Sequence, residues 1–120
     1  MSQDSYNIDE QLPLTPAVFH IMLALADQER HGYGIMQEVA EMTERDNPMG
    51  PGTLYGSIKR MIKAKLIEES DERPDPALDD ERRRYYRLTE FGGKVLAAEV
   101  QRLSTLVQVA QVKHIPRGAE

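Results

Sequence analysis

The side chains best suited to chemistry lie in one short basic segment of an otherwise acidic chain. The 120 residues carry 15 Lys and Arg against 20 Asp and Glu, for a formal net charge of −5. Residues 52–66 nevertheless contain four basic residues and no acid. On a helix that turns by about 100° per residue, Lys59, Arg60 and Lys63 share one face. Such a face can neutralise phosphates, and an Arg can also hold a guanine through two hydrogen bonds.

The rest of this segment divides between a polar flank and an apolar face. Thr53 and Tyr55 lie beside the cations, and their hydroxyls can donate to a phosphate or to the edge of a base. Gly56 would let the helix approach a groove closely. The apolar face, which should pack on a core, consists of Leu54, Ile58, Met61 and Ile62. Because a basic helix face is commonly just solvated, the face alone leaves both nucleic-acid binding and simple solvation open.

Other kinds of site are disfavoured. The chain has no Cys, which excludes disulfides, thiolate metal ligands and cysteine nucleophiles. His20, His31 and His114 are far apart, and no two of them have the spacing of metal ligands on one helix. The glycine-rich stretch 50–56 fits neither the dinucleotide-binding spacing nor the phosphate loop. The acidic run 79–81 is typical of a solvated loop. We therefore expect no enzyme, no metal and no cofactor.

The length and the distribution of apolar residues set further limits. A chain of this size folds as one domain and buries roughly two thirds of the surface of its unfolded form, so we expect no large enclosed active site. The first residues lack the basic and apolar regions of a secretory signal. No apolar run approaches the ~18 residues that a membrane span needs. We expect a cytoplasmic protein with no membrane partner.

Helices must position the basic face. Residues 1–13 are polar and end at a proline, so we predict a mobile arm. Thr15 and Pro16 are typical of a helix start, as N-cap and first helical residue, and the first helix should run to about Asp27. Its buried stripe is predicted to be Val18, Phe19, Met22, Leu25 and Ala26.

Two more helices should follow the first. A break at His31 and Gly32 precedes a second helix with a helical apolar spacing. Its apolar positions are Ile35, Val39 and Met42. The breaker-rich loop 47–52 then leads into the third helix, which carries the basic face.

The second half of the chain changes character. Residues 67–72 are short and compatible with a strand, and residues 83–88 alternate in the manner of one. Two prolines between them cannot continue a helix, so we predict a β-hairpin. Thr89 then caps a long helix to about Lys113, followed by a tail over 115–120.

This order of elements predicts the fold class, mainly α with a small β-hairpin. Three helices followed by a hairpin form a winged helix-turn-helix domain, here over residues 14–88, whose second and third helices are the DNA-reading pair. A long C-terminal dimerisation helix over residues 89–114 completes the chain.

The final helix carries an apolar repeat that is typical of self-association. The repeat has the four-three spacing of a heptad pattern, and its members are Leu96, Val100, Leu103, Val107 and Ala110. Pairing with a second copy would cover this surface and give a two-fold dimer. We expect the first helix to share the interface through Phe19. The alternative is that the final helix folds back onto its own core.

Three segments resemble the signature segments of the PadR family of bacterial transcriptional regulators. The segments are His31–Ile35, Gly50–Tyr55 and Arg84–Gly92. The resemblance covers roughly residues 14–110, and the single helix after the hairpin resembles the compact branch of the family. It implies a homodimeric winged-helix repressor that acts on palindromic operators. It also implies that the amino half of the third helix, with Thr53 and Tyr55, faces DNA and that Tyr33 contacts a phosphate.

Two features depart from the family pattern. Family members commonly have Gly where this chain has Lys65, which must take a left-handed conformation at some cost or end the helix differently. The tip of the wing is acidic and should be repelled by phosphate, so we expect it not to enter a groove. Its acids are Asp75, Asp79, Asp80 and Glu81. Arg82, Arg83 and Arg84 at its base either contact the DNA backbone or pair with neighbouring acids.

The sequence thus predicts a homodimeric, sequence-specific DNA-binding regulator, a repressor that reads a palindromic operator in double-stranded DNA with its third helix. The runner-up, which the net charge and the acidic wing favour, is a dimeric winged-helix module that senses a ligand or binds a protein without reading DNA. Many members of the resembled family respond to a ligand or to stress. We therefore also consider a small-molecule effector of unidentified structure, whose natural place is between the final helix and the first.

Overall fold

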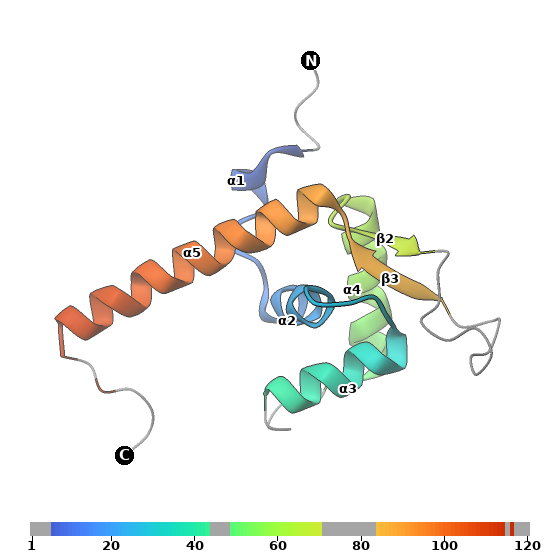
Figure 1. Cartoon of the computed structure of the whole chain (residues 1–120), viewed down its shortest axis with the longest axis horizontal. Coiled ribbons are helices and arrows are strands. Elements are labelled where there is room, and N and C mark those ends of the chain that lie inside the picture. The colour runs from blue at the N-terminus through green and yellow to red at the C-terminus, as the bar shows by residue number, and fades with distance from the viewer. Residues whose placement is uncertain (1–5, 44–48, 71–83, 115, 117–120) are drawn as a thin grey trace.

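The structure is a computed structural model, and it describes residues 6–43, 49–70, 84–114 and 116. The helices pack together with one small sheet at the edge of the body, and a long helix leaves the body at the C-terminal end (Figure 1). In chain order the elements are α1 (Ile8–Gln11), α2 (Pro16–Leu25), β1 (Arg30–His31), α3 (Gly32–Met42), α4 (Pro51–Lys63), β2 (Ile67–Ser70), β3 (Tyr85–Leu88) and α5 (Glu90–Val112). This arrangement confirms the predicted fold class.

Two helices begin where the sequence predicts, for the predicted reason. The hydroxyl of Thr15 accepts a hydrogen bond from the Val18 N–H (3.3 Å) at the start of α2, and Pro16 is the first helical residue. The hydroxyl of Thr89 accepts one from the Gly92 N–H (2.8 Å) at the start of α5. Both caps satisfy an N–H group that has no partner within its helix.

The sheet has one strand more than the predicted hairpin. Its order is β1-β3-β2 and both pairings are antiparallel. In the hairpin, Ile67 lies opposite Leu88 and Ser70 opposite Tyr85. The additional strand β1 pairs its two residues with Tyr86 and Tyr85. A strand of two residues has no alternation from which a sequence pattern could reveal it.

His31 links this strand to the next helix. It is the second residue of β1, and its Nδ1 accepts a hydrogen bond from the Gly34 N–H (3.1 Å), which caps α3. Its ring also meets the ring of Tyr85 edge-on at 5.1 Å. The predicted break at His31 and Gly32 is therefore a junction between a strand and a helix, and α3 starts at Gly32.

The turn between α4 and β2 takes the left-handed conformation that was one of two options at Lys65. Its φ is 68°. The Lys65 N–H donates to the Ile62 carbonyl (3.0 Å) and the Leu66 N–H to the Met61 carbonyl (2.9 Å), the pattern of a Schellman cap. The Thr89 hydroxyl donates to the Lys65 carbonyl (2.6 Å), which ties the start of α5 to this turn.

The core lies where α2, α3, α4, the sheet and the first half of α5 meet. Its buried apolar residues are Ile21, Met22, Ala24, Leu25, Ile35, Val39, Leu54, Ile58, Met61, Leu66, Ile67, Tyr86, Phe91, Val95 and Leu96. The predicted stripe on α2 is wrong in part. Ala26 is exposed because it is the C-cap, and Val18 and Phe19 are only partly buried, whereas Ile21 and Ala24 are buried.

Two further residues predicted on apolar faces are exposed. Met42 ends α3 with 37% of its surface exposed, and Ile62 on α4 is 40% exposed. Each lies at the edge of its helix's buried stripe, where the neighbouring elements do not cover it.

The structure corrects the prediction of a mobile arm for residues 6–13, the part of that segment that it describes. From Tyr6 onward the segment is packed, and α1 lies against α5. The rings of Tyr6 and Phe91 meet edge-on at 5.3 Å. Ile8 and Leu12 are partly buried against the core. These apolar residues, spaced one helical turn apart within a polar stretch, give α1 a face that packs.

A buried carboxylate fastens the same segment. Glu99 on α5 is only 2% exposed. It accepts hydrogen bonds from the Leu14 N–H (3.1 Å) and from Arg102 Nε and Nη2 (2.6 and 3.0 Å). The hydrogen bonds from Arg102 hold the pKa of the Glu99 carboxyl below its ordinary value, against the opposing effect of burial.

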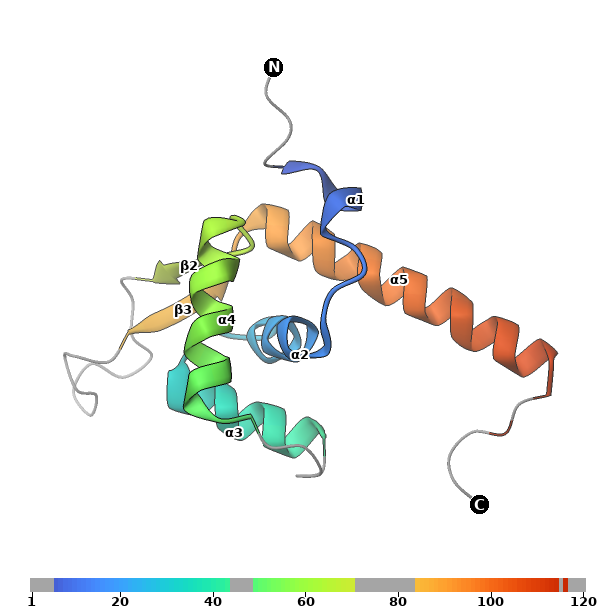
Figure 2. The same cartoon turned by 180° about the vertical axis from the view of Figure 1, so that it is seen from behind.

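The helix α5 has two different halves. Phe91, Val95 and Leu96 in its first half are buried in the core. Beyond Glu99 the helix extends away from the body, as both views show (Figures 1 and 2), and none of its residues is buried within the chain. None of the helices in the described ranges is long and apolar enough to cross a membrane.

Candidate nucleic-acid interface

The helix α4 has one buried and one open side. Leu54, Ser57, Ile58 and Met61 are buried. Figure 2 shows α4 on the surface of the helical body, with α2 on one side of it and β2 on the other. Its outer side is therefore free to meet a partner along the length of the helix.

The cations of this outer side have no ion-pair partner among the residues that the structure describes. Lys59, Arg60 and Lys63 are exposed, and none of them forms an ion pair with any residue that the structure describes. Arg60 Nη2 donates a hydrogen bond to the buried Ser57 hydroxyl (3.3 Å), which holds the guanidinium group against α4. Three cations without a described ion-pair partner raise the potential of this face in an acidic protein.

The hydroxyl-bearing residues flank these cations. Thr53 is exposed, and Tyr55 and Tyr33 are 49% and 59% exposed. Tyr33 lies in the first turn of α3. The Tyr55 phenol reaches back from α4 to Gly32, the first residue of α3. The structure thus brings residues of the two helices together at one end of the surface, and this contact has no signal in the sequence.

Gly56 is not required by internal packing. A Cβ at this position would lie 3.7 Å from Arg60 Nη1, an ordinary van der Waals distance. A larger residue would therefore fit the folded chain. The lack of a side chain here agrees with a close approach of α4 to a partner.

At the base of the wing, the described arginines pair with acids. Arg84 forms an exposed ion pair with Glu69 (3.4 Å), and Arg87 forms one with Glu68 (2.9 Å). The partner of Arg84 is thus an acid across the hairpin, whereas the wing-tip acids lie outside the described residues. Burial raises the pKa of the Tyr86 hydroxyl beside these pairs, and the negative charge of Glu69 raises it further. Several predicted positions lie outside the described residues: Arg82, Arg83, Asp75, Asp79, Asp80 and Glu81.

The predicted dimer residues separate into two groups. Leu96 is 6% exposed and belongs to the chain's own core, so it has little surface left for a partner. Val100 and Val107 are 44% and 53% exposed, while Leu103, Ala110 and Phe19 are partly buried. The open part of the repeat therefore starts at Val100.

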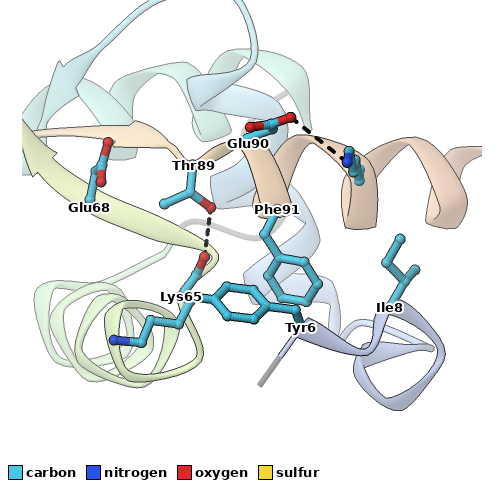
Figure 3. Close-up of a pocket in the computed structure, with 8 residues that line it drawn as sticks. Tyr6, Ile8, Lys65, Glu68, Thr89, Glu90 and Phe91 are labelled. Atoms are coloured by element: carbon cyan, nitrogen blue, oxygen red, sulfur yellow. Dashed lines mark hydrogen bonds and ion pairs between the residues drawn. The ribbon is translucent and has the colours of Figure 1, made fainter. Parts of the chain in front are cut away.

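The structure also has an open cleft of about 600 Å³. It is lined by the N-terminal segment, the base of the wing and the first turns of α5. Figure 3 shows Tyr6 against Phe91 in this cleft, with Lys65 and Glu68 to one side and Ile8 to the other. This is not the place between α5 and α2 that the sequence suggested for an effector.

The sequence matches the family described as "Transcriptional regulator PadR-like family" over residues 21–98. The chain belongs to the PadR-like family. Members of this family are DNA-binding transcriptional regulators and not enzymes.

An uncharacterized protein from Lysinibacillus sphaericus is 30% identical over 95 residues, which cover 79% of each chain. An uncharacterized 37.1 kDa protein in transposon TN4556 from Streptomyces fradiae is 29% identical over 86 residues, and the match spans only 22% of that relative.

Solved structures of PadR-like regulators share the fold. A PadR family transcription regulator from Clostridium difficile superposes with a TM-score of 0.68 at 25% identity, over 84% of this chain and all of that one. A PadR-like regulator from Bacillus cereus also gives 0.68, at 20% identity, over 83% of this chain and 92% of that one. These matches cover the body that presents α4.

Proposed function

We propose that this PadR-like protein is a homodimeric repressor that reads a palindromic operator with the outer side of α4. The observation that carries the proposal is the set of cations on that side, Lys59, Arg60 and Lys63, which the described part of the protein leaves without counter-charges. Phosphates supply such counter-charges, and binding releases the ions condensed on DNA. The helix-turn-helix formed by α3 and α4 is the geometry in which a second helix enters the major groove.

Each exposed residue of this surface has a proposed role. Arg60 and Lys59 contact base edges or phosphates, and Lys63 contacts the backbone near the end of α4. Thr53 and Tyr55 donate hydroxyl hydrogen bonds near the start of α4, and Gly56 leaves room for the groove. Tyr33 contacts a phosphate from the first turn of α3. Arg82, Arg83 and Arg84 contact the DNA backbone, and Arg84 exchanges its exposed ion pair with Glu69 for one with a phosphate.

The proposed dimer forms through the open half of α5. The repeat from Val100 through Leu103 and Val107 to Ala110 would pack against a second copy, with Phe19 of α2 at the edge. In this division residues 14–88 bind DNA and residues 89–114 hold the dimer. A two-fold dimer would place the two α4 helices on half-sites about one turn of DNA apart.

The proposal is tested with labelled DNA from upstream of the protein's own gene. Fluorescence anisotropy should show tight binding that a scrambled duplex of equal length does not compete away. Two chains should bind each duplex. Binding that scrambled DNA abolishes would contradict operator recognition on this duplex.

The net charge of −5 and the glutamates at the base of the wing favour a second candidate, a dimeric winged-helix module in the cytoplasm that senses a ligand without reading DNA. Absence of binding to any duplex at low salt would support this candidate. A ligand that alters binding to the operator duplex would instead identify an effector of the repressor.

A further inference from the structure

Gly32 lies where the start of α3 meets the side chain of Tyr55 on α4. The residue is buried although it begins its helix. A Cβ built on it would overlap the Tyr55 hydroxyl oxygen and lie 2.7 Å from Tyr55 Cζ. Atoms that are not bonded do not approach so closely, so no side chain fits here while Tyr55 keeps its place. Gly32 does not have a left-handed φ, so its backbone conformation would accept an alanine.

The group that blocks this position is the far end of a half-exposed side chain. The Tyr55 ring can swing toward solvent if a methyl group appears at position 32, and no backbone needs to move. Gly92 shows the opposite case, because a Cβ there would overlap the Leu66 carbonyl oxygen and lie 2.9 Å from the Leu66 carbonyl carbon. A substitution at Gly92 therefore strains the fold, whereas one at Gly32 displaces a surface phenol.

The displaced phenol belongs to the proposed DNA surface. Tyr55 sits in the first half of α4, one turn before Lys59, and its ring crosses to the helix that carries Tyr33. With the phenol seated on Gly32, its hydroxyl has a fixed place between the two helices before any partner arrives. A group held in its binding position loses less freedom when it binds than one that must be ordered.

We propose that Gly32 is a positioning residue for DNA recognition: it has no side chain so that the phenol of Tyr55 is seated between α3 and α4. The inference rests on the proposed function, since it assigns a recognition role to a residue that does not itself need to touch DNA.

The test is a double-mutant cycle between Gly32→Ala and Tyr55→Ala, read by operator affinity. Gly93→Ala is the matched control, because a Cβ at Gly93 has no neighbour within 4 Å. Gly32→Ala should weaken operator binding by about tenfold, while Gly93→Ala leaves it unchanged. In the Tyr55→Ala background, Gly32→Ala should produce no further loss. Both glycine variants should be as dimeric as the parent and should unfold at similar urea concentrations.

Three results would overturn the inference. Gly32→Ala could bind like the parent, or could weaken binding equally with and without Tyr55. It could also fail to fold, in which case the contact serves the fold and not the surface.

A second readout needs no DNA and separates this inference from the proposed function. With 3-fluorotyrosine in place of the five tyrosines, the fluorine resonance of Tyr55 is assigned by Tyr55→Phe. Gly32→Ala should move this resonance and Gly93→Ala should not. An unmoved resonance would overturn the seating of Tyr55 even if the parent binds its operator. A parent that binds no DNA would overturn the proposed function, and with it the recognition role of Gly32.

Discussion

The two most open helix surfaces of the molecule, the outer side of α4 and the far half of α5, differ in charge. The first carries Lys59, Arg60 and Lys63 without a described counter-charge. The second contains no charged residue from Leu103 to Val112, although none of its residues is buried within the chain. Both surfaces are exposed in the single chain. A basic surface favours binding to a polyanion, whereas an uncharged apolar surface favours packing against another apolar surface.

The difference also explains how an acidic protein can bind DNA. The described arginines on other elements are paired: Arg30, Arg84, Arg87 and Arg102 each form an ion pair with Asp or Glu. Lys59, Arg60 and Lys63 on α4 form no ion pair with any described residue. The net charge of −5 therefore describes the rest of the surface and not the face that we propose meets DNA.

The largest expected effect comes from placing a charge on the uncharged surface. Leu103→Glu should convert the proposed dimer to monomers and reduce operator affinity by at least about a hundredfold, because each half-site would be bound alone. Sedimentation velocity and anisotropy measure the two effects. Gln108→Glu adds the same charge on the polar side of α5 and should remain dimeric. A Leu103→Glu protein that stays dimeric would refute the proposed dimer interface on α5.

The second effect concerns the boundary between the two halves of α5. Glu99→Gln should lower the free energy of unfolding by about 2 kcal/mol at pH 7, because a buried carboxylate with two charged hydrogen bonds is replaced by a neutral amide. Since the folded-state pKa of Glu99 lies below its ordinary value of 4.5, its stabilising effect is complete above that value and is lost as the pH falls through the folded-state pKa. Urea unfolding of both proteins should show the difference shrinking below pH 4.5. A difference that is independent of pH would contradict this account.

The third effect tests the basic surface. Lys59→Ala and Arg60→Ala should each weaken operator binding by about tenfold, while the dimer and the fold stay intact. Lys94→Ala is the matched control, since Lys94 is an exposed cation on α5 that pairs with Glu90 (3.8 Å). If both α4 variants bind as tightly as the parent, the basic face has been assigned wrongly.

The smallest effect concerns the end of α4. Lys65→Gly should raise the free energy of unfolding by about 1 kcal/mol, because glycine takes a left-handed φ without the clash of a Cβ. Lys63→Gly, in the last turn of the helix, should instead lower it by a similar amount. Thermal or urea unfolding compares the two. Equal signs for the two variants would contradict the left-handed cap at Lys65.

The sequence predicted those elements whose causes are local. Thr15, Pro16 and Thr89 start helices because a hydroxyl cap or a fixed φ acts within one turn. The apolar spacing of α4 was equally readable at Leu54 and Ile58, since a helix repeats its faces over short distances. The basic face follows from the same periodicity.

The remaining features depend on residues that are far apart in the chain. Strand β1 forms because Arg30 and His31 pair with β3. Leu96 is buried in the core because the rest of the body packs against α5 as far as this residue. The contact of Gly32 with Tyr55 and the hydrogen bond from Leu14 to Glu99 join positions 23 and 85 residues apart. No periodicity within one segment contains this information.

The proposal that DNA phosphates neutralise the cations of α4 is tested by the salt dependence of binding. Operator affinity should be measured by anisotropy from low to moderate salt. The account predicts that log K falls linearly and steeply with log salt concentration, at about 0.9 per phosphate neutralised, and less steeply for Lys59→Ala and Arg60→Ala. A slope near zero, or one that both substitutions leave unchanged, would contradict it.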